Sequence, residues 1–409
     1  MDPGLQPVGP ITGSQRILSL DVLRGVAVLG ILIMNIQGFA MIMAAYMNPT
    51  AYGDLEGVNW WVWYFGHLLA DMKFITIFSM LFGAGLVIMT SRREAAGQGS
   101  AGAYYRRMGW LLLFGVLHAH LLWYGDILYS YAMCGFVLYL FRKAPPWLLI
   151  GLGVAVASVA WLLGVFFGIS LANGWVPVEA VAADWAPPPE VFEKEIAAYR
   201  GSWLDQMRPR IKAALFLETF IFAIGIAWRV GGMMLIGMAL GKLGVFTAAR
   251  SRRFYWGLVA VAALIGLPTI MYGVHRNVEA GWSLKYSFFF GPQFNYWGSM
   301  LVALGWVGVV MLVCKSDSLR PFTRPFAAVG RMALTNYLMQ TVLCTFIFYG
   351  HGLGQFGMFE RWQQGLVVVV IWVLQLVVSP IWLRHFRFGP AEWLWRSLTY
   401  MELQPMRRS

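Results

Sequence analysis

Residues 18–46 read LSLDVLRGVAVLGILIMNIQGFAMIMAAY and hold one Asp and one Arg among mostly apolar residues. A helix needs about 20 such residues to cross the hydrocarbon core of a bilayer, which is about 30 Å thick, because each residue rises about 1.5 Å. The stretch is too long for a removable signal peptide and lacks its small-residue cleavage site. It therefore predicts a membrane-spanning helix that stays in the protein.

The composition extends this prediction to the whole chain. Of its 409 residues, 59% are apolar and 12% are charged, about half of the roughly 25% charged residues of soluble domains. This excludes an ordinary soluble enzyme, a disordered chain and a nucleic-acid binder. We predict an all-α polytopic integral membrane protein with about ten transmembrane helices. The ten stretches are 18–46, 60–90, 104–122, 126–141, 147–171, 211–240, 254–274, 284–313, 325–349 and 362–383.

The charges predict how the bundle is oriented. The chain has 31 Lys and Arg against 19 Asp and Glu, a net charge of +12, and basic residues collect in cytoplasmic loops. If both termini are cytoplasmic, basic segments on the inner side alternate along the chain with acidic segments on the outer side. The excess positive charge then reflects topology and needs no nucleic-acid partner. We divide the chain into a disordered tail (1–15), one transmembrane domain (16–401) and a basic tail (402–409). The long outer loop 172–210 is either a lid or a surface hairpin.

Polar residues inside the predicted spans are candidate site residues. An ionisable group at the bilayer centre costs about 2.5 to 3.5 kcal/mol on insertion scales, so it usually faces the bundle interior. Asp21 and Arg24 share one helical face at the inner end of the first span, and Asn35 lies three turns further along that face. Asp21 and Arg24 either form part of a site or are an interfacial pair that sets orientation.

Two histidines have an aspartate within reach. His67 and Asp71 are one helical turn apart, and Lys73 follows them in the second span. The WYGD turn after the third span brings Asp126 back toward His118, and a carboxylate that orients a histidine is typical of a general base. Both groups can instead be buried structural networks. His118 and His120 point to opposite faces and cannot chelate one metal, so we predict no metal site.

Further polar residues lie in the sixth and ninth spans. Glu218 and Arg229 are expected on one face, each answering a charge such as Lys73 or Asp71 on another helix. Asn336 and Gln340 are one turn apart, and such amides often join helices by hydrogen bonds. The three cysteines, Cys134, Cys314 and Cys344, lie in apolar runs without a disulfide or zinc spacing.

Six ordered motifs carry a resemblance to a known family. They are RILSLDVLRGVAVLGILIMNIQGF (16–39), KFITIFSMLFGAGL (73–86), LHAHLLWYGDILYSYA (117–132), LIGMALGKLGVF (235–246), VGRMALTNYLMQT (329–341) and FGPAEWLWRSLTY (388–400). In order and spacing, they resemble the bacterial domain-of-unknown-function 418 family, the YeiB-like membrane proteins. That family looks like a branch of the transmembrane acyltransferase superfamily, which includes heparan-alpha-glucosaminide N-acetyltransferase and the membrane O-acyltransferases of bacterial glycans.

The resemblance implies a multi-pass protein of the bacterial plasma (inner) membrane, surrounded by membrane lipids. It implies transfer of an acyl group from a cytosolic acyl-CoA, such as acetyl-CoA, to an acceptor on the other side. The Leu20-Asp21-x-x-Arg24-Gly25 opening is similar to the relatives' first span. Their catalytic histidine then corresponds to His67 with Asp71, whereas the YeiB-like pattern singles out His118 and Asp126. Both pairs remain catalytic candidates.

On this basis we hypothesise a layout for the site. Roughly 21 Å of helix separates Tyr104, at the inner basic belt, from His118. Donor phosphates would bind at the inner end, and His118 would act as general base or transient acyl carrier, oriented by Asp126. Lys73 or Arg229 would stabilise the oxyanion. The candidate residues for donor and substrate binding are Asp21, Arg24, Asn35, Arg106, Arg107, Glu218, Arg229 and Asn336.

Other functions remain open. Asp71, Lys73, Glu218 and Arg229 could line the pathway of a transporter or exporter of a lipid or small molecule, although no paired Gly/Pro-broken helices are visible in the sequence. A non-catalytic scaffold is a third interpretation. A lipid headgroup, a surface glycan and a secreted metabolite all suit an outward-facing acceptor site. The number of protomers is open, and a homodimer is one possibility.

Overall fold

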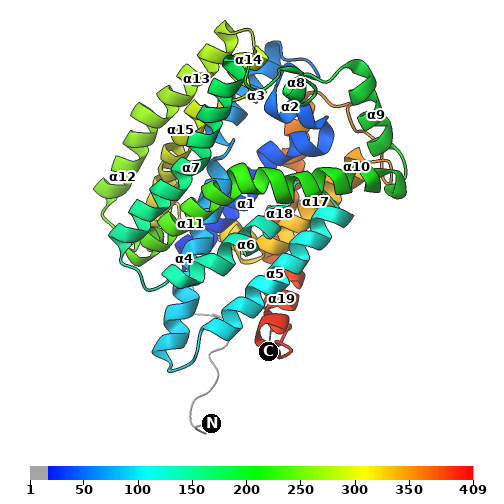
Figure 1. Ribbon diagram of the computed structural model, residues 1–409. Coiled ribbons are helices and arrows are strands. Elements are labelled where there is room, and N and C mark those ends of the chain that lie inside the picture. Colours follow the sequence, from blue (N-terminus) through cyan, green and yellow to red (C-terminus); the bar gives the residue numbers. More distant parts are fainter. Residues whose placement is uncertain (1–16, 409) are drawn as a thin grey trace.

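The computed structural model describes residues 17–408, so the predicted tail at 1–15 lies outside the described residues. Within them the chain is helical, and the one β-bridge joins Phe386 to Arg407 near the carboxyl end (Figure 1). The helices are α1 (Leu18–Ala40), α2 (Met43–Met47), α3 (Gly57–Leu69), α4 (Lys73–Ala95), α5 (Ala101–Leu121), α6 (Leu128–Leu138), α7 (Pro146–Ala172), α8 (Glu179–Trp185), α9 (Pro189–Arg200), α10 (Trp203–Phe216), α11 (Ala227–Lys242), α12 (Arg252–Val261), α13 (Leu267–Glu279), α14 (Leu284–Ser287), α15 (Pro292–Cys314), α16 (Arg320–Arg331), α17 (Ala333–Phe348), α18 (Arg361–His385) and α19 (Pro390–Tyr400).

Seven helical segments within residues 17–408 are long and apolar enough to cross a membrane, so this is a multi-pass membrane protein. They are Leu18–Ala40, Gly57–Ala95, Pro146–Ala172, Trp203–Lys242, Arg252–Glu279, Leu284–Cys314 and Arg361–His385. Two shorter helical segments, Leu128–Phe141 and Ala333–Phe348, are also apolar. The total of ten spans stays a prediction.

The second predicted span, 60–90, is not one helix. The structure divides it into α3 and α4 around residues 70–72, where Met72 adopts a left-handed conformation (φ 65°). The amide of Asp71 bonds to the carbonyl of Gly66, which leaves the carbonyl of His67 to accept the ammonium of Lys73. A buried lysine thus finds a backbone acceptor because the helical ladder is interrupted.

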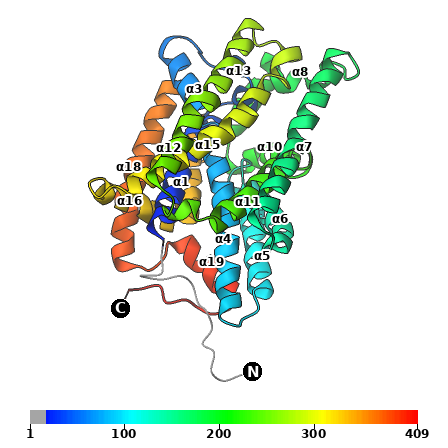
Figure 2. The same ribbon diagram turned by 90° about the vertical axis from the view of Figure 1, so that its left-hand side faces the viewer.

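Helix α1 lies at the centre of the bundle (Figures 1 and 2). In its most apolar window 72% of the residues are buried, against 17% in α7 and 28% in α18, which lie on opposite sides of the molecule in Figure 2. Leu23, Ala27 and Leu32 of α1 are fully buried. The exposed faces of α7 and α18 are mainly apolar, which suits contact with lipid.

The loop 172–210 forms a packed cap at the end of the bundle that lies away from α19 (Figure 1). It folds into α8, α9 and the start of α10. Glu195 of α9 accepts the amide of Met43 (3.0 Å). Tyr199 accepts the amide of Gly350 (2.9 Å), and Arg200 donates to the carbonyl of Phe356 (2.8 Å).

Candidate functional site

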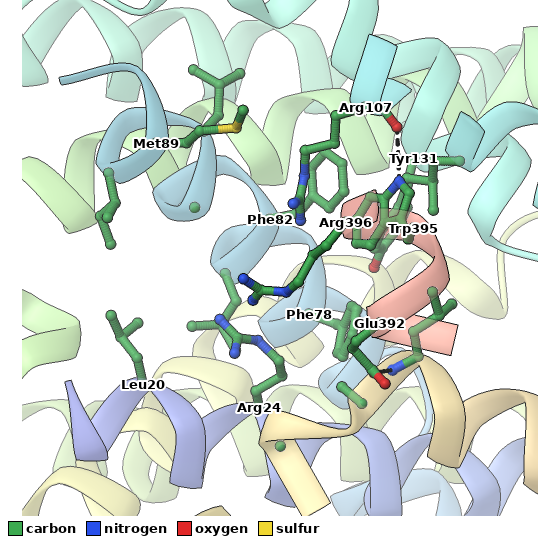
Figure 3. A pocket seen from close by; sticks show the side chains of 18 of the residues that line it. Leu20, Arg24, Phe78, Phe82, Met89, Arg107, Tyr131, Glu392, Trp395 and Arg396 are labelled. Atoms are coloured by element: carbon green, nitrogen blue, oxygen red, sulfur yellow. Dashed lines mark hydrogen bonds between the residues drawn. The ribbon is translucent and has the colours of Figure 1, made fainter. Parts of the chain in front are cut away.

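A cavity of about 380 Å³ lies between the first part of α1, residues 78–93 of α4, the first half of α5, α6, the junction of α16 and α17, and α19 (Figure 3). Residues from both ends of the described chain, from Ile17 to Tyr400, line it. The cavity therefore lies at the end of the bundle where α1 begins and α19 ends. Its size is within the usual range of small-molecule sites.

The mouth of the cavity is rich in arginine. Arg24 donates to Asp21 (3.0 Å), and the guanidinium of Arg107 lies 3.7 Å from the centre of the Trp395 ring. Figure 3 shows Arg24, Arg107 and Arg396 around one space. The arginines that line the cavity are Arg24, Arg92, Arg93, Arg107, Arg331 and Arg396. So many guanidinium groups favour an anionic ligand, and above all a phosphate, which arginine can bind in a bidentate manner.

Among residues 17–408, the carboxylates that line the cavity beside these arginines are Asp21 and Glu392. Glu392 already accepts hydrogen bonds from the amides of Leu334 (2.6 Å) and Thr335 (3.1 Å) at the start of α17. Burial raises the pKa of this carboxyl group, and its hydrogen bonds oppose the rise. The mouth is therefore electropositive, and Glu392 serves mainly to hold α17 in place.

The interior of the cavity is apolar. Its walls come mainly from α1, α4, α5 and α6, and they suit the hydrocarbon part of an amphiphilic ligand. The apolar lining residues are Ile17, Leu20, Val28, Ile31, Phe78, Leu81, Phe82, Leu86, Ile88, Met89, Met108, Leu111, Ile127, Leu128, Ala333 and Leu334.

Two tyrosines, Tyr131 and Tyr337, lie at the deep end of the cavity, away from the arginines and beside Ile127 and Leu128. The hydroxyl of Tyr131 bonds to Ser79 (2.9 Å). The hydroxyl of Tyr337 is buried near the backbone of Ile127 but completes no hydrogen bond. The Tyr337 ring lies 5.2 Å from the ring of His118. Tyr337 therefore lies between the cavity and the imidazole of His118, and its hydroxyl has no hydrogen-bond partner among residues 17–408.

His118 is part of a buried polar chain behind Tyr337. It lies near the end of α5, and the chain turns through Trp123 to Asp126 before α6 begins. His118 Nδ1 is 2.8 Å from Asp126 Oδ1, and Nε2 is 2.9 Å from Thr341 Oγ1. Asp126 Oδ2 also accepts the amide of Tyr129 (2.7 Å). The pairing expected from the WYGD turn is present, and Asp126 holds the ring in one orientation.

The second predicted pair, His67 and Asp71, is also formed, with Nδ1 and Oδ2 3.0 Å apart. Asn295 connects it to Lys73, because its amide donates to Asp71 (2.8 Å) and its oxygen accepts from Lys73 Nζ (2.7 Å). Lys73 is fully buried, whereas the side chains of His67 and Asp71 are 21% and 15% exposed. Arg229 lies beside this group and bonds to Thr76 (3.0 Å).

The charged groups expected to converge therefore form two clusters. One is His118, Asp126 and Thr341. The other is His67, Asp71, Lys73, Asn295 and Arg229. Lys73 and Arg229 neither contact His118 nor line the cavity.

Among the other predicted site residues, Asp21, Arg24 and Arg107 line the cavity. Arg106 points elsewhere and donates to the carbonyl of Thr399 (3.0 Å), and Asn35 is not among the lining residues. Asn336 bonds to Ser379 of α18 (3.1 Å), the interhelical bond expected of such an amide.

Glu218 has its partner on another helix, as expected, but the partner is neither of the two residues suggested. It pairs with His120 (2.9 Å) and with neither Lys73 nor Asp71. A π-helical segment, Leu217–Ile226, separates α10 from α11 and changes the register between Glu218 and Arg229. Glu218 and Arg229 therefore do not share the face that a regular helix would give them.

Several site residues were not singled out from the sequence. Arg92, Arg93, Arg331 and Arg396 were expected only as basic residues of inner loops, and Trp395, Tyr337 and Thr341 lie in quoted motifs without an assigned role. Their relation to the site depends on contacts between distant segments. The positive-inside pattern was the available signal for the arginines. It predicts the side of the membrane on which they lie, but it does not predict that they line one cavity.

The fold and cavity define the class: a multi-pass α-helical membrane protein with an arginine-lined cavity at the end where α1 begins. The chain belongs to the DUF418 family. The family model described as "Protein of unknown function (DUF418)" matches residues 240–402. The chain is 34% identical to the uncharacterized protein YeiB of Escherichia coli (strain K12), over 96% of this chain and 98% of the relative. It is 32% identical to the uncharacterized protein YxaH of Bacillus subtilis (strain 168), over 98% of each.

Proposed function

We propose that this protein is a membrane acyltransferase that takes an acyl group from an acyl-CoA. The observation that carries the proposal is an apolar cavity that has arginines at its mouth. At its deep end Tyr337 alone lies between the cavity and the His118–Asp126 pair. An acyl-CoA has the matching order of groups, with phosphates at one end and a thioester with its hydrocarbon chain at the other. The arginines bind the phosphates, and the apolar walls hold the acyl end.

The residues at and behind the deep end of the cavity have separate roles in the transfer. His118 accepts the proton of the attacking nucleophile as that nucleophile bonds to the thioester carbonyl carbon. The hydroxyl of Tyr337 donates a hydrogen bond to the carbonyl oxygen, which becomes negative in the tetrahedral intermediate. The carbon–sulfur bond then breaks, and the leaving thiolate takes that proton from His118, so that CoA departs as the free thiol. Asp126 keeps the imidazole in the required tautomer throughout.

The proposal places the protein in the bacterial plasma membrane with ten spans, and the arginine mouth faces the cytosol. Acyl-CoA is then available on the side where basic residues gather. The acceptor is a lipid headgroup, a glycan or a small metabolite at the opposite face.

Purified protein in liposomes made from bacterial lipids tests this function. The wild type should bind CoA and release free thiol from acetyl-CoA or a longer acyl-CoA. His118→Ala should lose thiol release, and His120→Ala is the matched control because His120 pairs with Glu218 outside the cavity. His67→Ala compares the second histidine pair. Full activity in His118→Ala would reject the site, and no binding of any CoA derivative would reject the function.

A second candidate function, transport of a small molecule, is favoured by the break between α3 and α4. Interrupted helices near buried charges form the substrate sites of many transporters, and Asp71 lies in the break. Transport predicts that Lys73→Met abolishes solute flux while acyl-CoA thiol release is unchanged. The acyltransferase proposal predicts no flux to abolish.

A further inference from the structure

Thr341 is the third member of a hydroxyl–imidazole–carboxylate chain. Its Oγ1 lies 2.9 Å from His118 Nε2, and the opposite ring nitrogen lies 2.8 Å from Asp126 Oδ1. A hydroxyl that contacts a base, which a third group orients, is the arrangement of an activated nucleophile. Thr341 is 1% exposed and His118 is 2% exposed, so the chain is shielded from water.

The hydroxyl of Thr341 differs from others in this bundle. Ser and Thr in membrane helices usually bond to the carbonyl four residues earlier. Thr76 does so at 2.6 Å and Thr219 at 2.6 Å, with Met72 and Leu215 as acceptors. The distance from Thr341 to the corresponding carbonyl, that of Tyr337, is 3.5 Å. The imidazole of His118 is therefore its main partner.

We propose that Thr341 carries the acyl group as a covalent ester between donor and acceptor, a step that rests on the acyltransferase function above. Thr341 Oγ1 bonds to the thioester carbonyl carbon as His118 Nε2 takes its proton. The carbon–sulfur bond breaks, and CoA leaves as the free thiol with that proton. The acceptor hydroxyl or amine then attacks the ester, passes its proton to His118, and Thr341 recovers its hydroxyl as the carbon–oxygen bond breaks.

The position of Thr341 suits this role. It lies one helical turn beyond Tyr337 on α17, and Tyr337 lines the inner end of the cavity. The Tyr337 hydroxyl has no hydrogen-bond partner among residues 17–408, so it is available to the carbonyl oxygen of a thioester that reaches Thr341. Two other nucleophilic residues follow on the same helix, Cys344 and Thr345. Thr345 bonds to the carbonyl of Val342 (3.3 Å) and has no base beside it, which makes it a matched control.

Isotope exchange tests the covalent step in the full-length protein. Without an added acceptor, the wild type should exchange labelled CoA into acetyl-CoA, because a covalent intermediate allows the first half-reaction to reverse. Thr341→Ala should lower this exchange by about 10³-fold or more. Thr341→Ser should retain it, and Thr345→Ala should match the wild type. Mass spectrometry of the peptide 332–361 should place the acyl group on Thr341, and removal by neutral hydroxylamine would identify a thioester on Cys344 instead.

Three results are decisive. Exchange that persists in Thr341→Ala overturns the proposal and points to another carrier. Thiol release in the wild type without any exchange also overturns it, and leaves a direct transfer by His118. Absence of CoA binding and of thiol release rejects the acyltransferase function itself, which is a distinct outcome because Thr341 plays no part in binding the phosphates.

Discussion

Gly25 of α1 and Gly330 of α16 face each other with no space for a side chain on either. A Cβ atom on Gly25 would collide with the carbonyl of Phe326, and one on Gly330 would collide with the carbonyl of Asp21. This close approach of two backbones brings Arg24, which precedes Gly25, and Arg331, which follows Gly330, to the same cavity mouth.

Gly330→Ala should therefore destabilise the protein and weaken CoA binding. Overpacking of this kind costs about 1 to 3 kcal/mol, and backbone atoms have little freedom to move away. The melting temperature in detergent measures the effect. Gly257→Ala on α12 is the control, since a Cβ there meets nothing within 4 Å. Equal melting temperatures for the two variants would contradict this account of the α1–α16 contact.

Gly85 of α4 presents the opposite case, because it lines the cavity and a Cβ there also meets nothing within 4 Å. Gly85→Leu should fill part of the cavity and abolish CoA binding without a loss of stability. Isothermal titration and thermal melting together test this. Gly151→Leu on the exposed face of α7 should leave binding unchanged. Unaltered affinity in Gly85→Leu would show that the ligand binds elsewhere.

Arg107 and Arg106 are neighbours on α5 that differ in direction, since only Arg107 lines the cavity. Arg107→Ala should raise the Kd for CoA by about 10- to 100-fold, because hydrogen bonds to charged groups contribute about 1.5 to 3 kcal/mol. Arg106→Ala should not change the Kd. If Arg107 binds the ribose phosphate, the difference in Kd between the Arg107→Ala and Arg106→Ala variants should be smaller for dephospho-CoA than for CoA.

Tyr337→Phe separates catalysis from folding. Loss of one donor to the developing oxyanion should lower kcat by about 10²-fold. The melting temperature should not fall, because the hydroxyl makes no hydrogen bond in the folded protein. A stable variant with full kcat would remove Tyr337 from the mechanism.

The outer cap should respond to pH through His351, which lies outside the spans and bonds to Gln206 (3.2 Å). Burial, and secondarily the charge of Arg210, lowers its pKa. The folded cap thus binds the proton less tightly than an open one, so its stability is present above the ordinary pKa of about 6.5 and is lost as pH falls below it. The protection factors of the α9 amides, which are corrected for the intrinsic pH dependence of exchange, should fall at pH 5 relative to pH 7.5, and His351→Gln should lack this change.

The pairing of His118 with Asp126 could be predicted from the sequence because both lie around one short turn. The contact between His118 and Thr341 could not, because it spans 223 residues and depends on how α17 packs against α5. The same holds for the arginines at the mouth. Their side of the membrane follows from the charge pattern, whereas their convergence depends on the packing of α1, α4, α5, α16 and α19.

The helix break at Asp71 could not be predicted either. The residues around it, 66–74, contain no proline, and the one glycine, Gly66, lies within α3. The break is explained only by Lys73, whose buried ammonium takes the carbonyl of His67 and the side chain of Asn295 on α15. A tertiary contact thus overrides local helix propensity.

The same break makes the connection between α3 and α4 depend on side chains. Helix α4 forms one wall of the arginine-lined cavity, and no residue of α3 is among those that line it. Because the helical hydrogen-bond pattern is interrupted at residues 70–72, the ammonium of Lys73, held by the carbonyl of His67 and by Asn295, joins the end of α3 to the start of α4. Removing that ammonium would therefore loosen a joint that a continuous helix would hold by its backbone alone.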